Sequence, residues 1–164
     1  MLLIIVGFLV FAIQIREMMK HKMKSKLDIG FQVAIYAVYG AAVSLVIALF
    51  VFLAFGDKFL IPFAFLFLVG WIGFSILGYL FKIVPFLWWT DKYSEKVGKE
   101  PVPMLKDMVD EKMGKMAFLL LFIGTLINTL GIGTKLSFLV FIGNTIYLAG
   151  GLFYSYLVLR IFRT

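Results

Sequence analysis

One lysine stands inside a long apolar stretch of the sequence, where a charge could take part in chemistry. Lys82 is the only side chain charged at neutral pH within the five main apolar runs. A lysine at the bilayer centre costs about 2.5–3.5 kcal/mol on insertion scales, which makes it a candidate functional residue. Lys82 lies seven residues before Trp89, or about 10 Å by helical rise, so its stem could also snorkel toward the membrane interface there. We predict that Trp88 and Trp89 are anchors at this interface. The alternative is contact with an acidic lipid, a quinone or a haem propionate.

Other ligands for protons and metals are scarce in the apolar runs. His21 is the only histidine of the chain, all nine acidic residues lie outside the runs, and cysteine is absent. Ion-coupled pumps usually hold a carboxylate at mid-depth, and a transmembrane b-type haem commonly needs histidines there. We therefore expect no catalytic residue and no cofactor held by this chain alone. A haem held by a partner subunit is an alternative. For this chain alone, enzymatic activity is the less favoured interpretation.

A group of methionines invites a copper hypothesis, because thioethers are soft ligands suited to Cu(I). Its members are Met104, Met108, Met113 and Met116. They also share one apolar helical face with Leu105 and Val109, and Pro103 suits the first turn of such a helix. We predict an amphipathic helix over 103–115 on the cytoplasmic membrane surface, with Cu(I) binding as the alternative.

The composition requires a membrane around these residues. Of the 164 residues, 63% are hydrophobic and only 15% are charged, too few for the polar surface of a water-soluble domain. About 20 apolar residues cross the hydrocarbon core as a helix. The apolar runs cover about 1–15, 29–55, 59–89, 116–130 and 136–159. The sequence therefore predicts one all-α domain over 1–164, a polytopic transmembrane bundle of about five spans.

Lysine and arginine alternate between the connecting segments. Five lie between the first and second runs and six between the third and fourth, whereas Lys58 and Lys135 stand alone in the other two connections. Cytoplasmic loops carry the excess of positive charge, so we expect an N-out, C-in protein of the inner (cytoplasmic) membrane. Positive charge follows the first run instead of preceding it, so no removable signal peptide is predicted. The net charge of +7 points to the lipid bilayer as partner and not to nucleic acid.

Small residues recur at helical spacing in the apolar runs, where they let neighbouring backbones approach. The predicted packing residues are Gly40, Ser44, Ala48, Gly70, Gly73, Gly78, Gly143 and Gly150. Asn128 and Asn144 are expected to form hydrogen bonds between helices. In a small homo-oligomeric transporter they would instead line a substrate path together with Lys82.

Part of the chain resembles bacterial membrane proteins related to haem–copper oxidase subunit I. The similar segments are Gly70-Trp71-Ile72-Gly73, Ile76-Leu77-Gly78 and Phe81-Lys82-Ile83-Val84-Pro85-Phe86. The resemblance implies a respiratory, electron-transfer setting. Relatives often carry histidines at the places of Phe63 and Phe65, and a histidine in place of Lys82 would be more familiar, so no metal-ligand role is carried over.

These patterns favour a non-catalytic integral membrane subunit of a larger complex, haem–copper-oxidase-like in setting. Its partners would be other membrane subunits or further copies of itself. A small homo-oligomeric transporter or permease is the first alternative, and a Cu(I)-handling membrane protein is the second.

Overall fold

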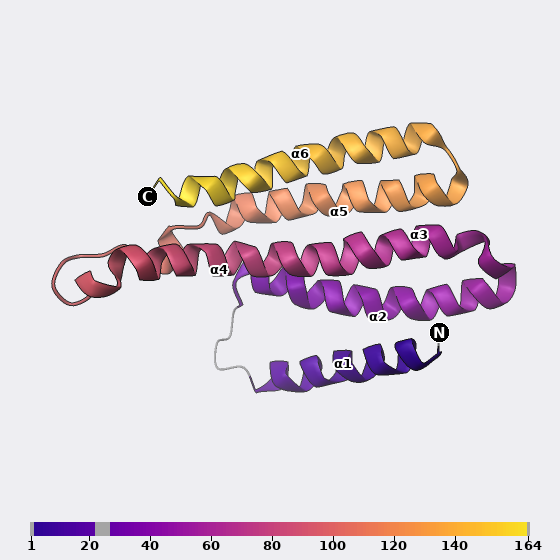
Figure 1. Cartoon of the computed structure of the whole chain (residues 1–164), viewed down its shortest axis with the longest axis horizontal. Coiled ribbons are helices and arrows are strands. Elements are labelled where there is room, and N and C mark those ends of the chain that lie inside the picture. Colours follow the sequence, from indigo (N-terminus) through magenta and orange to yellow (C-terminus); the bar gives the residue numbers. More distant parts are fainter. Residues whose placement is uncertain (1, 22–26, 164) are drawn as a thin grey trace.

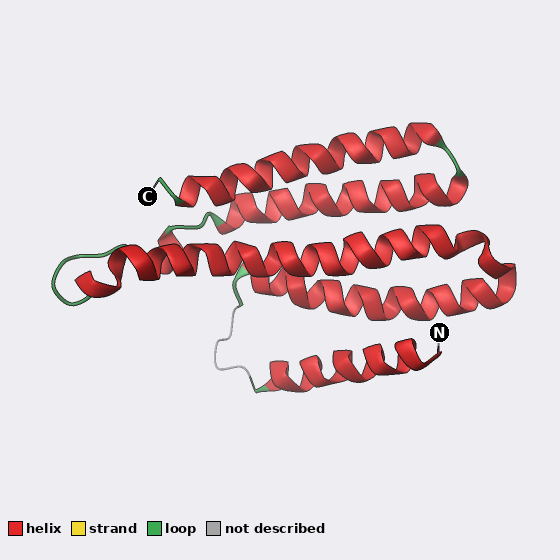
Figure 2. Cartoon of the chain, viewed as in Figure 1, coloured by secondary structure: helices red, strands yellow, loops and turns green. Residues whose placement is uncertain are grey.

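The computed structural model describes residues 2–21 and 27–163, and every regular element among them is helical (Figure 2). The α-helices are α1 (Leu2–Lys20), α2 (Ile29–Phe55), α3 (Leu60–Phe65), α4 (Phe74–Tyr93), α5 (Glu111–Thr134) and α6 (Ser137–Ile161). A π-helical segment, Leu66–Gly73, joins α3 to α4 in one continuous rod. Short 3₁₀ turns cover Gly56–Phe59, Ser94–Lys96 and Leu105–Asp107. The all-α prediction is confirmed.

Consecutive passes of the described chain along the bundle are antiparallel (Figure 1). In this view the α3–α4 rod lies between α2 and α5, with α1 at one edge of the row and α6 at the other. The bundle is not flat, because α6 also contacts α4 and α2 also contacts α5. The end of α1, the start of α2 and the segment that joins α4 to α5 lie at the same end of the bundle as the end of α6 (Figure 1). The turns after α2 and α5 lie at the opposite end. The described basic residues in the last turns of α1, α4 and α6 and in the α4–α5 connection therefore lie at one end, which we call the basic end.

Among the residues that the structure describes, three helical stretches are long and apolar enough to cross a membrane, which indicates a membrane protein. They are Ile29–Lys96, Glu111–Thr134 and Ser137–Ile161. The first stretch is a hairpin, because α2 and the α3–α4 rod fold back on one another (Figure 1). α1 lies outside the three stretches, so the number of five spans stays a prediction.

The predicted helix over 103–115 is wrong for most of its length. Residues 105–107 form a single 3₁₀ turn, and α5 begins only at Glu111. Asp110 ends the irregular segment, because its carboxylate accepts hydrogen bonds from the backbone N–H groups of Lys112 and Met113, both at 3.0 Å. A side chain that satisfies these free donors fixes the helix start there. Residues 111–115 therefore extend the transmembrane helix that was expected to begin at Met116.

Small residues set the closest approach between α2 and α4. A Cβ atom at Gly30 would lie within clashing distance of the Gly78 carbonyl oxygen, and one at Gly78 would lie 2.5 Å from the carbonyl oxygen of Gly30. Neither position has room for a side chain. The two backbones touch here, close to the basic end.

The α5–α6 hairpin packs along two rows of small residues spaced by seven. Ala117, Gly124 and Gly131 form the row on α5, and Gly143 and Gly150 form the row on α6. A seven-residue repeat keeps one seam in contact along both helices. The hairpin turn is short, and Lys135 adopts the left-handed conformation with φ of 58° so that its N–H reaches the last carbonyl oxygens of α5.

Three aromatic rings join the α5–α6 hairpin to α4. Phe81 is 3% exposed and packs edge-on against Phe118 at 5.5 Å between ring centroids, and Tyr154 lies 5.7 Å from Phe81. The Tyr154 hydroxyl donates a hydrogen bond of 2.7 Å to the carbonyl oxygen of Leu77. Gly114 leaves space for the Phe81 ring, since a Cβ there would lie 2.7 Å from it. This cluster forms the centre of the main hydrophobic core.

Candidate functional site

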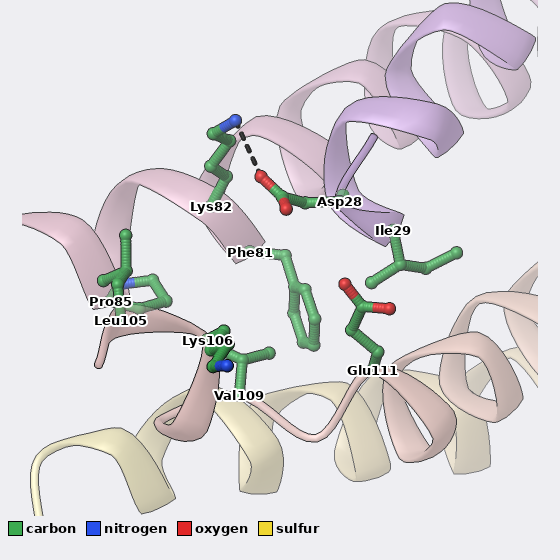
Figure 3. Close-up of a pocket in the computed structure, with 10 residues that line it drawn as sticks. Asp28, Ile29, Phe81, Lys82, Pro85, Leu105, Lys106, Val109 and Glu111 are labelled. Carbon is green, nitrogen blue, oxygen red and sulfur yellow. Dashed lines mark ion pairs between the residues drawn. The ribbon is translucent and has the colours of Figure 1, made fainter. Parts of the chain in front are cut away.

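Lys82 forms an ion pair at the basic end of the bundle. Its Nζ atom lies 2.8 Å from Oδ2 of Asp28, the residue immediately before α2, and the two side chains point toward one another (Figure 3). The ammonium group also lies 5.2 Å from the ring centroid of Phe31. The two charged side chains are 43% and 46% exposed. Lys82 therefore has a protein partner and remains open to the surroundings.

A small pocket of about 140 Å³ lies beside this ion pair. Phe81 projects between Lys106, from the α4–α5 connection, and Glu111, at the start of α5 (Figure 3). Ligand pockets usually enclose about 300–1,000 Å³, so this one is too small for a haem or the ring of a quinone. Its four charged residues, Asp28, Lys82, Lys106 and Glu111, can hold water or a small ion.

Asp28 is the member of this site that the sequence analysis missed. The sequence does not single out Asp28, because it lies outside the apolar runs. The available signal was the hairpin itself. In an antiparallel hairpin, residues at equal sequence distances from the turn lie opposite one another. Applied to the Gly56–Phe59 turn, this rule places Asp28 and Lys82 within about two helical turns of one another.

The four candidate copper ligands do not share one face. Met104 precedes the 3₁₀ turn and is 61% exposed, whereas Met108 is 9% exposed and lines a pocket with Leu157 and Arg160. Met113 and Met116 belong to α5 and are exposed. The shared face was expected from one continuous helix, and that helix does not form. Among the described residues, no group of three or more histidine, cysteine or acidic side chains could hold a metal ion.

Trp88 and Trp89 attach the end of α4 to other segments. The Trp89 indole donates a hydrogen bond of 2.7 Å to the Pro103 carbonyl oxygen in the α4–α5 connection. The Trp88 ring packs edge-on against Phe162 beyond α6, at 5.1 Å between centroids. Both rings are partly buried. They therefore make protein contacts at the basic end, where interface anchors were expected.

Asn128 and Asn144 do not face a common path with Lys82. Asn128 is 3% exposed and lies against Gly143, between α5 and α6. Asn144 is exposed on the outer side of α6. Lys82 is at the basic end, whereas Asn128 comes 14 residues after Gly114, about 21 Å further along α5. The structure does not bring together the residues proposed for a transport path.

The predicted packing residues fall into two groups. Gly78, Gly143 and Gly150 lie at close helix contacts, and Ser44 and Ala48 are each 8% exposed. Gly40 meets no neighbour, because a Cβ there would have nothing within 4 Å. Cβ atoms at Gly70 and Gly73 would meet only atoms of their own helical rod: the Leu66 side chain and the Leu68 carbonyl oxygen.

An apolar groove of about 660 Å³ follows the bundle between α2 and α5, along the π-helical segment. We define the apolar groove by Gly40 and Ile47 of α2, Gly70 and Trp71 of the π-helical segment, and Phe118 and Phe122 of α5. Lys115 stands at its basic end. Gly40 and Gly70, which their spacing predicts to be packing residues, leave space here instead.

Comparison with known proteins adds no relative. No family model, no curated protein and no solved structure matches this chain. The function therefore has to be argued from the chain itself.

Proposed function

We propose that this chain is a non-catalytic integral membrane subunit that binds a partner transmembrane helix on the outer face of α6. The proposal includes five spans, N-out and C-in, in the inner membrane, as the distribution of lysine and arginine favours. The observation that carries it is a row of two polar residues, one glycine and one leucine on a helix face that the described fold leaves uncovered.

This row consists of Asn144, Leu148, Gly151 and Ser155. Spacings of four, three and four residues place the four side chains on one side of a helix. Asn144 and Ser155 are exposed, and neither side chain bonds to a residue that the structure describes. Leu148 is 63% exposed, and a Cβ at Gly151 would have nothing within 4 Å.

The surroundings explain why such a row needs a partner. α6 is at the edge of the row of helices (Figure 1), and its contacts with α5 use Gly143 and Gly150 on a different side. Lipid tails cannot form hydrogen bonds, so an amide facing them carries an unfavourable free energy. A second helix could supply these bonds, and Gly151 would let its backbone approach closely. Hydrogen bonds of this kind contribute about 0.6–2 kcal/mol each.

The test is purification from native membranes in a mild detergent, followed by mass identification and an absorption spectrum of every co-migrating chain. We expect the wild-type chain to carry partner helices, and we expect Asn144→Leu and Gly151→Leu to lose them. Gly40→Leu is the matched control, because it adds the same side chain at an equally open glycine of α2. Partners retained by both α6 variants would refute the proposal.

The identity of the co-migrating chain decides the setting. A haem-bearing partner would support the respiratory interpretation, which rests on the sequence resemblance. A second copy of this chain as the only companion would replace the larger complex with a homo-oligomer and would make transport assays the next step.

A further inference from the structure

We propose that the apolar groove binds one phospholipid, with an acyl chain along its floor and an anionic headgroup at Lys115. The site is separate from the outer face of α6 and does not depend on the function proposed above. Its volume of about 660 Å³ lies within the range of about 300–1,000 Å³ that is usual for ligand sites.

The lining of the groove is mostly hydrocarbon. Besides the phenols of Tyr36 and Tyr39, its hydroxyl groups are those of Ser44 and Thr125. The Ser44 hydroxyl donates to the carbonyl oxygen of Ala41, and the Thr125 hydroxyl donates to the carbonyl oxygen of Leu121, both at 2.9 Å. A polar solute would therefore find few partners to replace its water, whereas an acyl chain needs none.

The length of the groove suits a long chain. Its α2 wall runs from Ile29 to Ile47, and 18 residues of helix rise about 27 Å. The hydrocarbon core is about 30 Å thick, so the groove is longer than half of the core. Tyr36, Ile47 and Phe122, all largely exposed, form its rims. A narrow groove of this length matches an extended tail better than a compact ring.

The two ends of the groove differ in charge. At the basic end, α2 approaches α5 where Ile29 meets Gly114, and Lys115 follows directly. The ammonium group of Lys115 forms no ion pair with a described residue. An anionic headgroup there would gain about fivefold in affinity, since a lysine near a membrane surface contributes about 1 kcal/mol toward anionic lipid. This complementarity fixes the direction of the lipid in the groove.

The groove is empty of protein because its floor residues are small. A Cβ at Gly40 would have nothing within 4 Å, so a larger side chain fits there without displacing any helix. A phenylalanine at this position would fill the path of the acyl chain. Replacing glycine within a helix also favours helix formation, so folding is preserved.

The test uses the full chain in mild detergent, titrated with phosphatidylglycerol or phosphatidylcholine and followed by native mass spectrometry. We expect one tightly retained lipid, with phosphatidylglycerol preferred about fivefold. Gly40→Phe should weaken retention of both lipids on the order of tenfold or more, as loss of the buried chain contacts requires. Lys115→Gln should leave phosphatidylcholine retention intact and abolish the preference.

Gly7→Phe is the control, because it places the same ring at an open glycine of α1, outside the groove. It should retain lipid as the wild type does, and Gly40→Leu checks the groove with a smaller side chain. Unchanged lipid retention in both Gly40 variants would overturn the assignment of the groove as a lipid site. The same result is expected if a partner helix, and not a lipid, occupies the groove. An unchanged preference in Lys115→Gln would overturn the assignment of the headgroup.

Discussion

At the scale of single residues, the pairing of Lys82 with Asp28 changes how the lysine is understood. A lone lysine in an apolar run suggests a ligand, but this one is 2.8 Å from a carboxylate at the start of the neighbouring helix. The two side chains remain nearly half exposed, so water and lipid headgroups screen their attraction. The pair therefore adds little to the free energy of unfolding.

The pair can be tested by a double-mutant cycle with Asp28→Asn and Lys82→Met. Exposed ion pairs contribute about 0.2–1 kcal/mol, and we expect a coupling free energy in that range. Each single variant should lower the free energy of unfolding in detergent micelles, and the double variant should recover part of the loss. Strictly additive effects would show that the two charges do not interact.

At the scale of elements, glycines have opposite roles according to the face on which they lie. Gly143 lies in the α5–α6 seam, where a Cβ would be 2.8 Å from the backbone nitrogen of Asn128. Gly151, on the same helix, faces open space. Spacing alone identifies both as small residues in a helix. Only the neighbour decides which of them is needed for packing.

This difference predicts unequal effects of one substitution on α6. Gly143→Ala should destabilise the chain by about 1–3 kcal/mol, because the added methyl group overpacks a backbone contact. Gly151→Ala should be neutral or slightly stabilising, since alanine favours the helix and meets no neighbour. Thermal unfolding in detergent, followed by circular dichroism, measures both. Equal unfolding midpoints of the two variants would contradict the close helix contact at Gly143.

The connection before α5 shows where periodicity misleads. The methionines, Leu105 and Val109 follow a helical pattern, yet 108–110 are irregular. The Asp110 carboxylate accepts two hydrogen bonds as a helix cap. The Trp89 indole donates to the Pro103 carbonyl oxygen, which a helix would use for a backbone hydrogen bond. Local capping and one long-range hydrogen bond outweigh a moderate amphipathic preference.

At the scale of the whole molecule, the described basic residues at the ends of α1, α4 and α6 gather at one end of the antiparallel bundle (Figure 1). Loops on the same side of a membrane must lie at the same end of such a bundle, and positively charged loops favour the cytoplasmic side. The absence of cysteine from the sequence makes the orientation directly measurable, because each introduced cysteine is unique.

Single cysteines at Leu3, Lys58, Lys135 and Arg163 should separate into two classes. A membrane-impermeant maleimide should label the first three in intact cells and Arg163→Cys only after permeabilisation. Leu3→Cys decides the number of spans, since an α1 that stays on the cytoplasmic side would leave it unlabelled. Lys135 and Arg163 labelled from the same side would rule out α6 as a span.

The sequence by itself determined the helical fold, the apolar passes and the side on which charge gathers. These features depend on transfer free energies and on periodicity within one segment, which do not require knowledge of neighbours. The tertiary structure alone decided the partner of Lys82, the apolar groove and the different roles of Gly40, Gly143 and Gly151. Each of these depends on the register and rotation of one helix against another. Many small contacts summed over whole helices set that register, and no local pattern encodes it.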